Sequence, residues 1–145
     1  VSLDGTQVGQ TAGTSLQVPA ALANGAYSWQ VAASNPAGLT GVSKVARIFV
    51  DTVAPVLKVT ESGRRRAGST EIVRLTYHDP APASGIAKLT IRWGDGTVTS
   101  VKPGTHRIAH VYRRPGRYKI TVTVADRAGN QTTVVRHVKI NAGGK

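Results

Sequence analysis

Residues 116–132 read GRYKITVTVADRAGNQT and carry the pattern that decides the fold. From Tyr118 to Ala125, apolar and polar side chains alternate, which is the period of a β-strand with one buried face. The β-branched residues of this run suit a pleated strand and disfavour a helix. A Pro-Gly pair precedes the run, and turn-forming residues 126–130 follow it. The sequence therefore predicts a half-buried strand that ends in a tight turn.

The same pattern occurs earlier, where residues 25–40 read GAYSWQVAASNPAGLT. Tyr27 lies 91 positions before Tyr118, and the Asp-Gly-Thr triplet at residues 4–6 lies 91 positions before that at residues 95–97. Two separate matches at one offset indicate a tandem repeat.

The repeat predicts how the chain is divided. Residues 54–141 form the complete module, and residues 1–53 match only its later part, because Val1 aligns with Arg92. We therefore expect residues 1–53 to be the C-terminal portion of a module and the chain to open in mid-domain. Residues 142–145 are expected to be a flexible tail.

Short apolar runs separated by turn signals predict the strands, and no helical periodicity accompanies them. This spacing is typical of all-β chains that fold as antiparallel β-sandwiches, here tandem immunoglobulin-like ones with the first incomplete. The predicted strands of the first module are 14–18, 27–33 and 42–50, and those of the second are 56–60, 72–77, 86–93, 97–101, 106–112, 118–125 and 132–140.

Composition narrows the function classes. The chain has no Cys, so neither disulfides nor thiolate chemistry is available. No apolar run approaches the roughly 20 residues of a membrane-spanning helix. The first 53 residues carry two bases and two acids, so the whole net charge of +12 lies in the second module. Such asymmetry can indicate a polyanionic partner.

Two arginine clusters are the candidate binding residues. The first occupies a predicted hairpin tip, and the second flanks the Pro-Gly turn before the strand at 118–125. In an immunoglobulin-like topology these loops tend to share one end of the sandwich, so we expect one exposed basic patch. Two interpretations stay open: a solvated surface that keeps a repeat protein soluble, or a site for phosphate, sulfate or carboxylate polymers. The clusters consist of Arg64, Arg65, Arg66, Arg113, Arg114 and Arg117.

Catalytic and metal signals are weak. His78-Asp79 precedes a proline and is typical of a loop rather than of an acid–base pair. His106 and His110 have the spacing of a helical zinc pair, but on a strand they would lie about 13 Å apart, too far to share one ion. No enzyme and no cofactor are predicted. Calcium is the alternative, with oxygen donors at Asp79, Asp95, Asp126 and Asn130.

Four short motifs lie in residues 54–141: Trp93-Gly94-Asp95-Gly96-Thr97, His110-Val111-Tyr112, Pro115-Gly116-Arg117-Tyr118, and the strand end with Asp126, Gly129 and Asn130. Through these motifs the second module resembles the PKD domain, an immunoglobulin-like module of bacterial surface proteins and secreted hydrolases. The first module resembles a related bacterial immunoglobulin-like or fibronectin-type-III-like repeat, but it lacks the H-x-Y element that His110-Val111-Tyr112 forms in the second.

The motif residues are expected to serve the fold. Gly96 permits a positive φ in its turn, and the Asp95 carboxylate can accept backbone N–H groups there. Tyr118 is placed as a tyrosine corner, and the inward parity of Trp93 favours the core over a sugar platform. The structural set is Trp93, Asp95, Gly96, His110, Tyr112, Tyr118, Asp126 and Gly129.

The resemblance implies a non-catalytic, extracellular or cell-surface repeat that acts as a spacer, an adhesion module or a carbohydrate- or protein-interaction module of a larger protein. The charge implies the alternative, a polyanion-binding domain for acidic glycan, cell-wall polymer or nucleic acid. Expected partners are extracellular glycans or proteins and neighbouring repeats of the same chain, and nucleic acid is less favoured.

Overall fold

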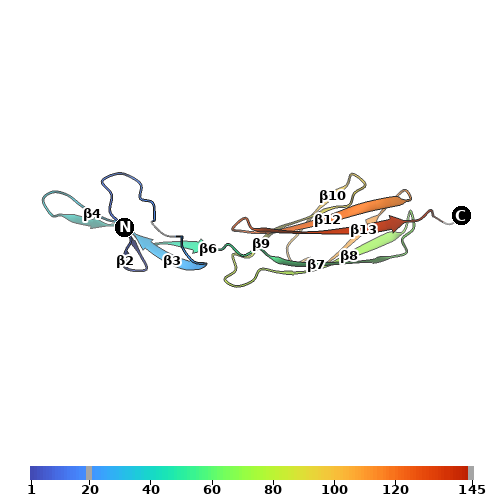
Figure 1. Ribbon diagram of the computed structural model, residues 1–145, viewed down its shortest axis with the longest axis horizontal. Helices are drawn as coiled ribbons and strands as arrows, with labels where there is room; N and C mark the ends of the chain where they lie inside the picture. Colours follow the sequence, from blue (N-terminus) through green and yellow to red (C-terminus); the bar gives the residue numbers. More distant parts are fainter. Residues whose placement is uncertain (19–20, 144–145) are drawn as a thin grey trace. The chain divides into compact units, whose positions relative to one another are not determined.

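The computed structural model describes residues 1–18 and 21–143, and its regular structure consists of strands (Figure 1). The chain divides into two compact units, Val1–Thr52 and Val53–Lys145. Of the expected tail at 142–145, residues 144–145 lie outside the described residues. Within the described ranges, no helix has the length and apolar character needed to cross a membrane.

The second unit is a sandwich of two antiparallel sheets. One sheet has the order β10-β9-β12-β13 and the other has the order β11-β8-β7. The strands are β7 (Val56–Gly63), β8 (Thr70–His78), β9 (Ile86–Arg92), β10 (Val98–Val101), β11 (Arg107–Val111), β12 (Gly116–Asp126) and β13 (Gln131–Ile140).

Strand β12 is the centre of the larger sheet. It pairs with β13 from Gly116 to Ala125 and with β9 from Thr121 to Asp126, where a register shift follows Ala125. Because its side chains alternate, Ile120, Val122 and Val124 face the other sheet and are buried. The core contains residues from both sheets, and its burial is the main term that stabilises the sandwich. Its other members are Val59, Val73, Leu75, Leu89, Ile91, Trp93, Val101, Tyr112, Val138 and Ile140.

The first unit repeats one sheet of the second. Its sheet order, β2-β1-β3-β6, matches β10-β9-β12-β13 position by position, and β4 and β5 form a separate two-stranded sheet. The strands are β1 (Ser2–Leu3), β2 (Thr6–Gln7), β3 (Gly25–Gln30), β4 (Ala32–Ser34), β5 (Thr40–Val42) and β6 (Ala46–Val50).

The corresponding sheet faces differ in exposure. Trp29 is 37% exposed and Ile48 is 39% exposed, although both lie on the face that is buried in the second unit. Their counterparts at the same sheet positions, Ile120 and Val138, are 1% and 2% exposed. Among the described residues of the first unit, no three-stranded sheet corresponds to β11-β8-β7.

The repeat is offset by one residue at the first turn. Ser2 pairs with Gln30 and Arg92 pairs with Thr121. Gln30 and Thr121 are 91 positions apart in the sequence, whereas Ser2 and Arg92 are 90 positions apart. The turn of the second unit therefore holds one extra residue between its strand and the Asp-Gly pair.

Three predicted strands are wrong. The predicted strand 27–33 is divided at Val31 into β3 and β4, which belong to separate sheets. Residues 14–18 form no strand. The Leu16 side chain instead packs against Gly9, so closely that a Cβ on Gly9 would lie 2.9 Å from a methyl group of Leu16. The predicted strand 42–50 is divided into β5 and β6. At the break, the Ser43 hydroxyl oxygen accepts the N–H of Val31 at 3.0 Å, a side-chain bond that replaces a ladder bond.

Candidate functional site

Four of the family-motif residues meet between the two sheets of the second unit: Trp93, Asp95, His110 and Tyr112. One carboxylate oxygen of Asp95 accepts the N–H of Thr97 at 3.0 Å and its hydroxyl at 2.6 Å. The other lies 2.7 Å from Nε2 of His110. The His110 ring stacks on Trp93 with centroids 4.3 Å apart and makes a T-shaped contact with the Tyr112 ring, with centroids 4.6 Å apart. These contacts tie the β9–β10 turn to β11 of the opposite sheet.

Two tyrosines extend this cluster. The Tyr112 hydroxyl donates to the carbonyl of Trp93 at 3.0 Å, and its ring stacks on Tyr118 with centroids 4.2 Å apart. Burial, and then the negative charge of Asp95, raises the pKa of Tyr112 well above its ordinary value. The Tyr118 hydroxyl donates to the carbonyl of Arg114 at 2.8 Å, and Tyr27 donates to Ala23 at 2.8 Å with the same four-residue spacing. The hydroxyls of these tyrosines bind backbone.

Hydrogen bonds determine the charge state of Asp95. Partial burial raises its pKa, but the hydroxyl and N–H of Thr97 and the ring of His110 together outweigh that effect. The pKa of Asp95 therefore lies below its ordinary value, and the carboxylate stays ionised at neutral pH. It acts as an acceptor that holds the turn, not as an acid ready to give up a proton.

Oxygen donors gather at the other end of the sandwich. Asp126 accepts the backbone N–H and the side-chain amide of Asn130, each at 2.8 Å. Asp79 accepts the N–H of Gly85 at 2.6 Å, and a carboxylate oxygen of Asp79 lies within 4.8 Å of one from Asp126. The structure thus groups Asp79, Asp126 and Asn130, while Asp95 contacts His110 elsewhere. Carboxylate and amide oxygens are ligands of the kind that calcium takes, six to eight at a site.

The two candidate histidines have different partners. Nδ1 of His106 lies 3.0 Å from the carbonyl oxygen of Leu75, and its ring stacks on Tyr77. His110 contacts Asp95. The ring of His106 packs against Tyr77, and the ring of His110 packs against Trp93.

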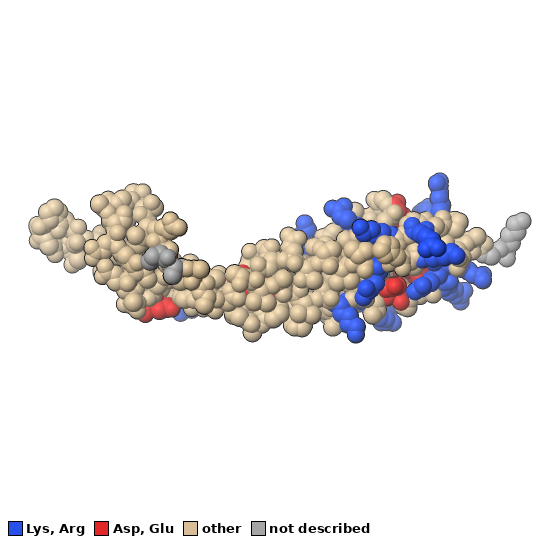
Figure 2. Space-filling view, in the orientation of Figure 1, with Lys and Arg blue, Asp and Glu red and all other residues tan. Residues whose placement is uncertain are grey.

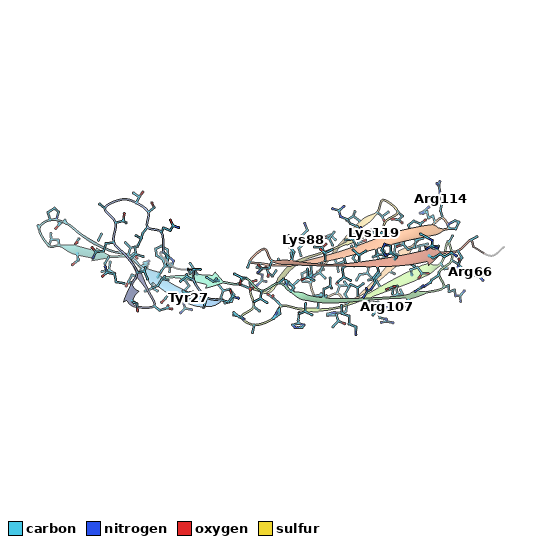
Figure 3. The ribbon with its side chains drawn as sticks, viewed as in Figure 1. Tyr27, Arg66, Lys88, Arg107, Arg114 and Lys119 are labelled. Atoms are coloured by element: carbon cyan, nitrogen blue, oxygen red, sulfur yellow. The ribbon has the colours of Figure 1, made fainter. Side chains whose placement is uncertain are left out.

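The structure brings both arginine clusters to one end of the second unit, which we call the arginine end: Arg64, Arg65, Arg66, Arg113, Arg114 and Arg117. Gly68, in the β7–β8 loop, donates its N–H to the carbonyl of Tyr112 at 2.9 Å, immediately before Arg113. Asn141 donates to the Arg65 carbonyl at 2.8 Å, so the end of β13 also joins this loop. All six arginines are exposed. Figure 2 shows basic side chains gathered at this end, and Figure 3 places Arg66 and Arg114 there.

A buried acid holds the arginine hairpin in place. Glu71 is 3% exposed, and one of its oxygens accepts the N–H of Arg65 at 2.6 Å. Arg65 has a φ of 51°, a left-handed conformation that costs a non-glycine residue free energy, so this bond helps to maintain it. A Cβ on Gly63 would lie 2.2 Å from the carboxylate. Sequence reasoning missed Glu71; the only signal was an acid between an arginine-rich turn and an apolar strand.

In the described part of the chain, the six side chains of the arginine end make no ion pair, although the buried Glu71 carboxylate lies at the base of the hairpin. A pocket of about 480 Å³ lies beside the hairpin and is lined by Gly63, Arg64, Gly68, Ser69 and Thr70. A guanidinium and two hydroxyls are donors suited to an oxyanion.

Comparison with known proteins identifies the second unit. The PKD domain family model matches residues 52–141, which is more than half of the chain. The chain is similar to the PKD1 domain of Vibrio anguillarum Epp, with 21% identity over 62% of this chain and 96% of that one, and a TM-score of 0.50. It is also similar to the PKD domain of an M14-like peptidase from Thermoplasmatales archaeon SCGC AB-540-F20, with 16% identity, 61% and 93% coverage, and a TM-score of 0.47. No curated protein matches. Through residues 52–141, the chain belongs to the PKD domain family.

Proposed function

We propose that this chain is a non-catalytic, extracellular β-sandwich repeat that acts as a spacer or interaction module of a larger secreted or cell-surface protein. Family membership supports this proposal, because PKD domains are immunoglobulin-like modules often found in extracellular proteins. The observation that supports it most is that the polar groups of the motif side chains are hydrogen-bonded within the fold. They bind one another or the backbone at Asp95, His110, Tyr112 and Tyr118.

A catalytic site needs a nucleophile, acid or base that is free to meet a substrate. The Asp95–His110 pair does not supply one. Asp95 and His110 have side chains only 19% and 14% exposed, and each is held against the other. Their geometry favours a rigid joint between the two sheets, as a spacer requires.

The test of a spacer is independent folding without turnover. The full chain and the piece 53–145 should show the same unfolding midpoint for the second unit in urea. Neither should hydrolyse a panel of peptides and polysaccharides. The control is His110→Ala, which should lower the unfolding midpoint. Turnover by the parent that is lost in His110→Ala while Trp93→Phe keeps it would overturn the proposal.

A second candidate function is binding of polyanions at the arginine end. It is supported by the convergence of both clusters, their exposure and the pocket with Arg64, Ser69 and Thr70. The test changes Arg64, Arg65 and Arg66 to Ser and compares the salt concentration needed for elution from immobilised heparin. The matched control removes three charges elsewhere, with Lys58→Ser, Arg74→Ser and Arg107→Ser.

The triple change at the arginine end should lower the elution salt clearly more than the control, because several guanidinium contacts would be lost together. Equal shifts would indicate that only net charge matters. Unchanged elution would remove this loop as the site.

A further inference from the structure

The outer face of the larger sheet carries a second basic surface, which we call the cationic ladder: Lys88, Arg92, Arg117, Lys119 and Lys139. Arg117 lies directly opposite Lys139, and Lys119 lies directly opposite His137, on the adjacent strands β12 and β13. Arg92 on β9 lies opposite Thr121 of β12, so Arg92 is on the same face of the sheet as Arg117 and Lys119. All five ladder residues are exposed. Figure 3 shows Lys88 and Lys119 on one side of the sandwich, with Arg107 on the other.

Among the residues that the structure describes, no acid lies on the sheet face of the ladder. The residues that share it, on β9, β10, β12 and β13, are threonines, Val98, Ser100, Ala125, Gln131, Val135 and His137. Like charges directly opposite each other destabilise a sheet. The Arg117–Lys139 pair therefore raises the free energy of the folded domain, and a bound anion would remove that repulsion.

The spacing favours a ligand with repeated charges. Alternate residues on one strand lie about 6.6–6.8 Å apart, and neighbouring strands lie about 4.8 Å apart. A single small anion could meet only two of these cations, whereas a linear polymer could follow them across three strands. Arg117 belongs to both the ladder and the arginine end, so one polymer could contact both surfaces.

The chemistry of the face argues for a polysaccharide. Binding of single-stranded nucleic acid uses exposed aromatic rings on which bases stack. In the second unit, Trp93 and Tyr112 are buried, and the exposed large apolar residues there are valines. The threonine hydroxyls between the cations, including the hydrogen-bonded Thr123 and Thr133, are instead suited to sugar hydroxyls.

We propose that the cationic ladder binds an acidic polysaccharide, a linear sugar polymer with sulfate or carboxylate groups, along the outer face of β9, β12 and β13. This inference rests on the second candidate function, and it adds a sheet surface and a partner class to the arginine end.

The experiment uses the full chain and a heparin-derived oligosaccharide in titrations at several salt concentrations. The ladder variant carries Arg92→Gln, Lys119→Gln and Lys139→Gln. The matched variant carries Lys58→Gln, Arg74→Gln and Arg107→Gln. It removes the same charge from the outer face of the opposite sheet, and it also removes a directly opposed like-charge pair there, Arg74 and Arg107. We expect the ladder variant to raise Kd at least tenfold and the matched variant less than threefold. The slope of log K against log salt should become shallower by up to about one per ladder cation removed.

A second measurement separates binding from folding. At low salt, the ladder variant should melt at the same or a higher temperature than the parent, because a like-charge pair is removed. Heparin should raise the melting temperature of the parent and not that of the ladder variant.

The outcomes separate the two proposals. If changing Arg64, Arg65 and Arg66 weakens binding and the ladder variant does not, the arginine end stands and the ladder inference fails. If the parent does not bind heparin at all, both fail. Polyphosphate or single-stranded DNA bound at the ladder as tightly as heparin would overturn the assignment to a polysaccharide.

Discussion

The imidazole of His110 lies face to face with the indole of Trp93, with ring centroids 4.3 Å apart and an interplanar angle of 11°. This contact joins the end of β9 in one sheet to β11 in the other. The Trp93 side chain is fully buried, and its indole N–H donates to the Thr99 hydroxyl at 2.8 Å. The motif therefore closes one end of the core.

Replacing Trp93 with Ala should lower the free energy of unfolding of the second unit by about 3–5 kcal/mol, because a large core side chain is removed and leaves a cavity. Urea unfolding measures the change. Trp29→Ala is the control, since that ring is 37% exposed and its loss should cost less. A Trp93→Ala variant that unfolds like the parent would show that this ring is outside the core.

Asp95→Asn should make the second unit less sensitive to acid. The folded-state pKa of Asp95 is below its ordinary value of 3.8, so the ionised carboxylate stabilises the fold above that pH. This contribution is lost as the pH falls from 3.8 through the lower folded-state pKa. Urea unfolding between pH 2.5 and 7 should show a parent–variant difference that is full at neutral pH and shrinks in acid. A difference that stays constant with pH would contradict the prediction.

Gly94→Ala should destabilise the second unit more than Gly96→Ala. Both residues have a positive φ, 85° and 92°, so each alanine carries a backbone cost of about 1–2 kcal/mol. A Cβ on Gly94 would also lie 2.7 Å from the carbonyl oxygen of Lys119, whereas one on Gly96 has nothing within 4 Å. Thermal melts of the two variants compare these terms directly. Equal melting temperatures would mean that the clash is relieved by a backbone shift.

Removing residues 1–52 should improve solubility and leave the second unit folded. The first unit exposes several large apolar side chains, among them Trp29, Ile48 and Phe49, and exposed apolar surface promotes association. Light scattering at rising protein concentration measures the effect. The control is Phe49→Ser in the full chain, which should give a smaller improvement. A piece that loses cooperative unfolding would show that the units depend on each other.

Local patterns were enough to predict most strands of the second unit. The alternation from Tyr118 to Ala125 is a property of consecutive residues, and β12 follows it. The failures at 14–18, 27–33 and 42–50 have non-local causes. A strand requires a neighbouring strand to accept its hydrogen bonds, and at Ser43 a side chain takes up a bond that the ladder would have used.

The two basic surfaces also differ in whether the sequence alone could reveal them. The arginine end was visible in sequence because its members are runs of adjacent residues beside turn signals. The cationic ladder was not, because Lys119 and Lys139 lie on the same sheet face only through the antiparallel register of β12 and β13. Glu71 was missed for a similar reason, since its role depends on a contact with Arg65 across the hairpin. Composition and periodicity determined the sandwich and its positive charge, whereas strand pairing alone decided which charges face one another.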